Sequence, residues 1–137
     1  MKKRLIRICL GLVLSLLMST SVDAACAEGR ELTGKNGHVY CISNIAINWY
    51  SAFAWCDAQG RSLATIEQIC DIDDTQKWDG NFGDGKCLNV NDTSAPYISV
   101  WSSLPYGLEH AVVVELSKGK VRTEGRGSLY NYYPICW

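Results

Sequence analysis

The chain has 137 residues, with 13 lysines and arginines against 14 aspartates and glutamates, so its net charge is −1. This balance provides no basic face to displace counterions from DNA or RNA, which excludes a nucleic acid as the expected ligand. The length suffices for one domain with its own core.

The first 24 residues have the three-part layout of a secretory signal. Four basic residues precede an apolar run over residues 8–18, and small residues follow up to Ala24, where we expect cleavage. The apolar run of about eleven residues is too short to cross a hydrocarbon core as a helix. A retained anchor and a lipoprotein acylated at Cys26 are the alternatives. We expect a signal peptide over residues 1–24 and one secreted or periplasmic domain over residues 25–137, with no membrane span after cleavage.

Removal of the signal would leave 9 basic and 13 acidic residues, a net charge of −4. Six cysteines would remain, and an even number in an exported chain predicts three disulfides. They have no CxxC spacing, which argues against a zinc site. These cysteines are Cys26, Cys41, Cys56, Cys70, Cys87 and Cys136.

The stretch NWYSAFAWCDAQG predicts a helix that begins after Asn48 as the N-cap and ends at Gly60. Its apolar residues recur at the spacing of one helical face, which should turn the cysteine toward the core. This stripe consists of Trp49, Ala52, Phe53 and Cys56.

A second helix should start after Thr65, because Gln68 three residues later completes a capping box. It would bury Ile66, Ile69 and Cys70. A polar, glycine-bearing loop is expected over residues 73–96.

Strands are predicted at residues 39–42, 97–103, 111–125 and 132–137, with a turn near Lys118 and Gly119. Alternation in the third segment places Val112, Val114 and Leu116 on one face. The expected class is α+β: two helices, a long polar loop and an antiparallel β-meander, stapled by three disulfides.

A buried cysteine in the first helix should bond a cysteine far away in the chain, and Cys136 is the candidate partner of Cys56. Closing a loop of about 80 residues would restrict the unfolded chain by roughly 4.5 kcal/mol, against roughly 3 kcal/mol for a loop of about 15. The other bonds would be local, with Cys26 and Cys41 closing an N-terminal hairpin. Cys70 and Cys87 would then close the base of the polar loop.

The stretch WYSAFAWCDAQGRSLATIEQ resembles the paired-helix signature of C-type-lectin-like domains, and VWSS, GKV and the terminal YYPICW resemble its bacterial branch. The resemblance covers most of residues 38–137, and it also implies the bond between Cys56 and Cys136. The Glu-Pro-Asn or Gln-Pro-Asp tripeptide and the Trp-Asn-Asp triplet of the calcium-dependent sugar binders do not occur here. Sugar recognition through a bridging calcium ion is therefore not implied.

Several surface candidates for binding follow from residue type. A tryptophan in or beside a polar loop can stack on a sugar or anchor a protein partner, and tyrosine with asparagine is typical of adaptable binding surfaces. Each has a structural alternative: strand alternation would bury about half of the C-terminal tyrosines and asparagine, and Trp101 lies in a strand, at a position that the resemblance gives to the core. The ligand-binding candidates are Trp78, Asp79, Trp101, Tyr130, Asn131 and Tyr132.

Two charged groups of residues have alternative interpretations. The acidic run from Glu67 to Asp84 could bind calcium, although it lacks the spacing of a twelve-residue calcium loop and a solvated acidic loop is the commoner explanation. The basic residues near Glu124 could contact anionic glycans or form an ordinary solvated hairpin; they are Lys118, Lys120, Arg122 and Arg126.

No catalytic motif is recognisable, and His38 and His110 lie in unrelated segments. We therefore expect an exported, non-catalytic recognition module that binds a glycan or an extracellular or envelope protein without a required cofactor. A small secreted or periplasmic inhibitor of another enzyme is the alternative of a different class. A subunit of a surface adhesin or pilus-like assembly is a third interpretation.

Overall fold

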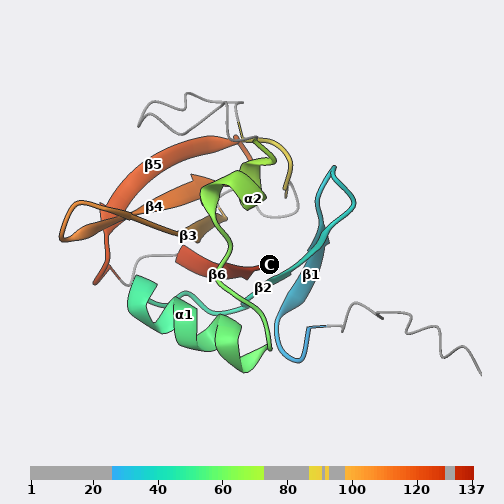
Figure 1. The fold of residues 1–137 in the computed structure, drawn as a ribbon, viewed down its shortest axis with the longest axis horizontal. Coiled ribbons are helices and arrows are strands. Elements are labelled where there is room, and N and C mark those ends of the chain that lie inside the picture. The colour runs from blue at the N-terminus through green and yellow to red at the C-terminus, as the bar shows by residue number, and fades with distance from the viewer. Residues whose placement is uncertain (1–25, 73–86, 91, 93–97, 129–131) are drawn as a thin grey trace, which may run out of the picture.

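The computed structural model describes residues 26–72, 87–90, 92, 98–128 and 132–137, so the predicted signal peptide and most of the predicted polar loop lie outside the described residues. The described part is an α+β fold with two helices and a six-stranded sheet, as expected (Figure 1). In chain order the elements are β1 (Arg30–Thr33), β2 (Val39–Ile42), α1 (Trp49–Ala58), α2 (Ile66–Cys70), β3 (Ser99–Tyr106), β4 (His110–Glu115), β5 (Lys120–Gly125) and β6 (Tyr132–Cys136).

The sheet is mixed, which corrects the expectation of a purely antiparallel meander. Strands β3, β4 and β5 form the meander, but β6 does not continue it at the edge. The strand order is β1-β2-β6-β3-β4-β5, so β6 enters the middle of the sheet, antiparallel to β2 and parallel to β3. The C-terminal strand therefore joins the N-terminal hairpin to the meander.

The sheet is covered on both faces. Successive residues of a strand point to opposite faces, and here the two sets belong to two separate clusters of buried side chains. Ile66 and Ile69 of α2 pack with Val112, Val114 and Leu116, which confirms the face predicted for these three. Trp49, Ala52 and Cys56 of α1 pack on the other face with Trp101, Ala111 and Val113. All four residues of the run AVVV are therefore buried, as is usual in strands whose two faces are both covered.

Helix α1 begins and ends where the sequence predicts. The Asn48 side chain accepts a hydrogen bond of 2.9 Å from the Ser51 amide, and Gly60 follows the helix with a φ of 70°. The predicted apolar stripe is wrong in one member, because Phe53 is 40% exposed. Its ring lies beside that of Trp49 instead, edge to face at 4.8 Å between centroids. The area of sheet beneath α1 is filled by the other three residues of the stripe.

Helix α2 has both bonds of the predicted capping box, from the Gln68 amide to Thr65 Oγ1 and from the Thr65 amide to Gln68 Oε1. Asp71 ends it in the left-handed conformation, with a φ of 55°.

The three disulfides join Cys26 to Cys41, Cys56 to Cys136 and Cys70 to Cys87, which confirms all three expected pairings. Such a set indicates an oxidising, extracytoplasmic compartment. Over the residues described, the helices are too short and too polar to cross a membrane.

Candidate functional site

Four of the six predicted ligand-binding residues lie outside the described residues, namely Trp78, Asp79, Tyr130 and Asn131. The other two, Trp101 and Tyr132, are buried, with 0% and 7% of their surfaces exposed. Their rings meet edge to face at 4.8 Å between centroids, beneath α1. Trp101 also donates from Nε1 to the Ile47 carbonyl at 2.8 Å, so it supports the segment that leads into α1.

Tyr132 lies at the margin of this cluster, where the sheet becomes polar. Burial raises the pKa of its phenol, a hydrogen bond to Glu124 raises that pKa further, and the nearby Arg122 opposes the shift. The Arg122 guanidinium lies 5.7 Å from the centre of the Tyr132 ring. The ring therefore faces its own charged neighbours on the sheet.

Two cations of the β4–β5 hairpin, Lys118 and Arg122, are paired with carboxylates. Lys118 Nζ lies 3.0 Å from Glu115 Oε1, and Arg122 Nε lies 3.1 Å from Glu124 Oε1. Arg122 also approaches Glu115, which is buried, with 3.5 Å between Nη1 and Oε2. These pairs neutralise much of the charge that a binding patch for anionic glycans would need.

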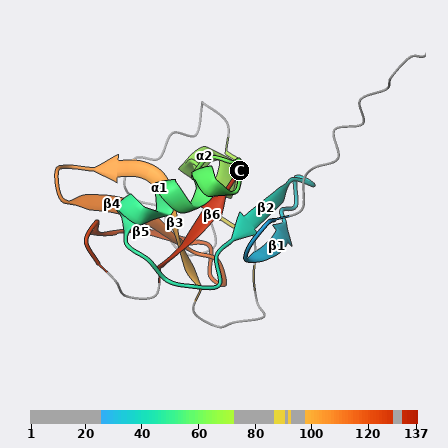
Figure 2. The same ribbon diagram turned by 90° about the horizontal axis from the view of Figure 1, so that it is seen from below.

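Arg126 is also engaged within the fold. It donates to the carbonyl oxygens of His110 and Gly107, each at 2.8 Å, and its guanidinium carbon lies 4.6 Å from the Trp49 ring centre. It thus fastens the β3–β4 hairpin to the first turn of α1. The hairpin extends past that end of α1 (Figures 1 and 2) and exposes Tyr106 by 50% and Leu108 by 92%.

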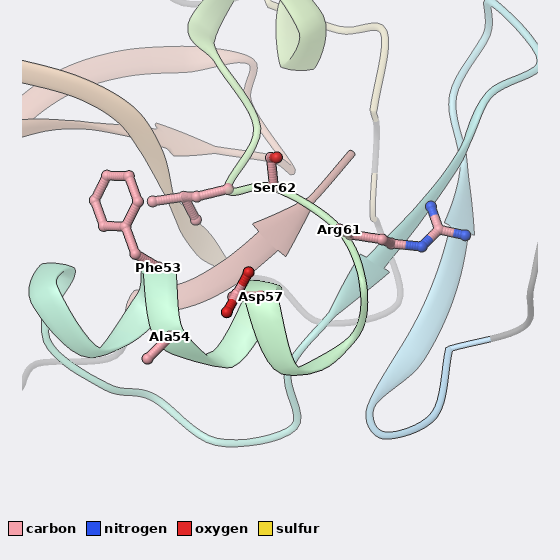
Figure 3. Close-up of a pocket in the computed structure, with 6 residues that line it drawn as sticks. Phe53, Ala54, Asp57, Arg61 and Ser62 are labelled. Carbon is pink, nitrogen blue, oxygen red and sulfur yellow. The ribbon is translucent and has the colours of Figure 1, made fainter.

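A depression of about 490 Å³ runs along α1 and is the principal candidate site of the described surface (Figure 3). One wall is helical: Asp57 lies four residues after Phe53 and three after Ala54, so its side chain neighbours both on the surface of α1. The opposite wall is the segment that returns from the helix, and it contributes Arg61, Ser62 and Leu63.

The return segment is held in place by the C-terminal strand. Ser62 exchanges two backbone hydrogen bonds with Trp137, of 2.9 and 3.3 Å, and the Ala64 amide donates to the Ile135 carbonyl at 2.9 Å. The bond between Cys56 and Cys136 joins the helical wall to the same strand. Both walls of the depression are therefore fixed to β6 before any ligand binds.

The lining is apolar at one end and polar at the other. The exposed ring of Phe53 and the buried Leu63 both line the depression. Asp57 and Ser62 are exposed, and their carboxylate and hydroxyl groups lie on the two sides of it (Figure 3). Arg61 turns away from Phe53 toward β2, where its Nη1 donates to the Val39 carbonyl at 2.9 Å. The depression thus offers a flat aromatic face, one carboxylate and one hydroxyl.

Metal-ligating side chains do not gather in the described part of the chain, where no group of three or more histidines, cysteines or carboxylates is found. Of the acidic run, only Glu67 and Asp71 are described, and the expected calcium alternative otherwise lies outside the described residues.

No protein-family model matches the chain, and no curated protein is significantly similar to it. Sequence reasoning did not find the depression, because Phe53 was assigned to the buried stripe and residues 61–63 were only a connection. The sequence does contain one sign that Phe53 could be exposed: Trp49 and Phe53 are large aromatic residues on neighbouring turns, and both cannot pack against the same area of sheet.

Proposed function

We propose that this chain is an exported, non-catalytic recognition module of the C-type-lectin-like class and that its ligand is a glycan. The observation that carries the proposal is the depression along α1, where an exposed aromatic ring lies beside a carboxylate and a hydroxyl. Sugars offer an apolar face and a rim of hydroxyl groups, and such a mixed lining matches both.

The scaffold supports this proposal. Two helices cover opposite faces of one sheet, and the bond between Cys56 and Cys136 joins the first helix to the last strand, as the resemblance implies. A site fixed in advance loses little conformational entropy on binding, which favours recognition by a shallow surface. Oxidising surroundings, outside the cell or in a periplasm, are where such a stapled module would meet glycans.

A glycan array tests the proposal directly. The exported chain, purified with its three disulfides formed, should bind a subset of immobilised glycans in calcium and equally in chelator, because the lining of the depression needs no metal. If chelator abolishes binding, the binding site needs a metal ion and is to be assigned to the acidic run around Asp79. A blank array under both conditions would contradict a glycan ligand.

The β3–β4 hairpin favours a second candidate function, inhibition of another enzyme. A fastened hairpin with Leu108 92% exposed at its tip has the shape of a segment that inserts into a partner's cleft. An inhibitor would form a stable one-to-one complex with an enzyme of the same compartment, and Leu108→Ala would weaken it. A surface-assembly subunit would copurify with similar surface proteins instead.

A further inference from the structure

We infer that the depression along α1 is a subsite for an uncharged saccharide, which stacks on Phe53 and whose hydroxyl groups donate to Asp57. This inference rests on the proposed glycan-binding function and goes beyond it by naming the site, the class of sugar and the residues that select it. A volume of about 490 Å³ falls within the range of roughly 300–1,000 Å³ found for small-molecule sites.

The aromatic part of the subsite is the ring of Phe53. This ring and that of Trp49 meet in a T-shaped arrangement, with 4.8 Å between ring centroids and planes 88° apart. Trp49 is itself fixed, since its Nε1 donates to the Ser102 carbonyl at 2.8 Å. The 40% of Phe53 that remains exposed is therefore a positioned apolar surface, on which a sugar can stack at small entropic cost.

The polar part of the subsite discriminates between neutral and acidic sugars. Among the described residues that line the depression, Asp57 is the only carboxylate and Arg61 the only cation, and Arg61 directs its guanidinium to the Val39 carbonyl. An ionised carboxylate accepts hydrogen bonds but donates none, so it suits the hydroxyl groups of a neutral sugar. It repels the carboxylate or sulfate of an acidic sugar. At a separation of about 4 Å in water, this repulsion lowers the affinity for the acidic sugar roughly fivefold relative to the neutral one.

Ser62 completes the subsite with a group that both donates and accepts. Its backbone is fixed by the two hydrogen bonds to Trp137, so its exposed hydroxyl stands opposite Asp57 across the depression. One sugar residue can therefore meet the aromatic face and polar groups on both walls, while the rest of a longer chain extends into solvent.

Tyr50 provides a matched control for Phe53. Both side chains lie on α1, both are exposed, and both rings meet Trp49 edge to face, at 5.5 Å for Tyr50 and 4.8 Å for Phe53. Only Phe53 lines the depression. A loss of binding specific to Phe53 would therefore report the subsite and not a general change in α1.

The test uses immobilised neutral oligosaccharides of glucose, galactose and N-acetylglucosamine, each paired with a sulfated or uronic acid counterpart. The wild-type chain should prefer the neutral members. Phe53→Ala should weaken binding roughly tenfold, which corresponds to a loss of about 1.4 kcal/mol in binding free energy and is typical of an aromatic at the centre of a site. Tyr50→Ala should change the affinity less than twofold. Asp57→Asn should narrow the preference for neutral sugars by raising binding of the acidic ones.

Denaturant midpoints of all three variants confirm that they are folded. If the wild type binds glycans while Phe53→Ala and Asp57→Asn bind as it does, the subsite lies elsewhere and the proposed function stands. A wild-type preference for acidic sugars would overturn the selection by Asp57. If the wild type binds no glycan at all, the proposed function and the subsite both fall.

Discussion

Cys41 and Cys136 lie directly opposite each other in the antiparallel pair of β2 and β6, yet each is bonded to a different cysteine. Both belong to the buried cluster beneath α1. The N-terminal segment and α1 are therefore attached side by side to β2, the inner strand of the hairpin, and to β6, which joins the hairpin to the meander. This arrangement makes the centre of the sheet the anchor of the candidate site.

Removing the long-range disulfide should cost more stability than removing the adjacent one. The double variant Cys56→Ala with Cys136→Ala opens a separation of 80 residues, against 15 for Cys26→Ala with Cys41→Ala. The chain-entropy relation gives about 4.5 and about 3 kcal/mol. Urea unfolding of the two double variants measures the difference, and a larger loss for the shorter loop would contradict the entropic ordering.

The single variant Cys56→Ala should rearrange its disulfides. It leaves the Cys136 thiol beside Cys41, and the spacing of about 4.5–5.5 Å between opposite Cα atoms in an antiparallel pair is within reach of a disulfide. The thiolate can then attack the bond between Cys26 and Cys41. Peptide mapping without reduction should find Cys136 joined to Cys41 or Cys26, whereas the double variant should retain only the two local bonds.

Local signals in the sequence predicted the helices well. The Asn48 cap, the capping box at Thr65 and the left-handed Gly60 each act within a few residues, so neighbouring sequence determines them. The parallel pairing of β3 with β6 joins residues more than thirty positions apart, as Ser99 and Tyr132 show. No local pattern encodes such a pairing, and the sheet order therefore emerged only in the structure.

The burial of Trp101 shows the same limit at the site. Strand periodicity places it on the face opposite Val100, but it does not say whether that face is covered. The covering element is α1, which is fixed there through Cys56 and Cys136, far from Trp101 in sequence. Trp101, a binding candidate by residue type, is consequently part of the core, in agreement with its structural alternative.

Substitution of Trp101 should reduce stability without changing glycan binding. Trp101→Ala would leave a cavity in a fully buried position and should cost about 3–5 kcal/mol. Trp101→Phe keeps most of the ring but loses the bond to the Ile47 carbonyl, a loss of about 1 kcal/mol beyond its packing cost. Thermal unfolding measures the stability loss of each variant. If Trp101→Phe is folded but binds glycans more weakly than the wild type, Trp101 belongs to a binding site and the prediction is wrong.

The protein should lose stability at high pH through Tyr132. Burial and Glu124 raise the pKa of this phenol above the usual 10.0, so the folded state retains a proton that the unfolded chain releases. The associated stability is fully present below the unfolded pKa and is lost as pH rises through the folded pKa. Tyr132→Phe should flatten the fall in urea midpoint above about pH 10.

Glu124→Gln separates the charge of Glu124 from the burial of Tyr132. Removing the carboxylate should lower the pKa of Tyr132 toward 10.0 without restoring it fully, since burial is the larger cause. Difference titration of phenolate absorbance, with Tyr132→Phe as the reference, gives this pKa. An unchanged pKa in Glu124→Gln would show that burial alone raises it.

Two hairpin glycines should differ in their tolerance of a side chain, although their backbones match. Gly107 and Gly119 lie in the turns on either side of β4, with φ of 63° and 59°. A left-handed non-glycine residue costs about 1–2 kcal/mol, and Gly107→Ala should cost only this, because nothing lies within 4 Å of the new Cβ.

At Gly119 the same Cβ would lie 2.7 Å from Leu88 Cδ2 and 2.8 Å from the Cys87 carbonyl oxygen. The backbone of Cys87 cannot yield easily, since its amide donates to the Gly119 carbonyl at 3.1 Å and its side chain is bonded to Cys70. Gly119→Ala should therefore lose at least 1 kcal/mol more than Gly107→Ala, within the usual cost of overpacking. Equal urea midpoints for the two variants would show that the segment at Cys87 moves aside, and that the disulfide to Cys70 does not hold it against the β4–β5 turn.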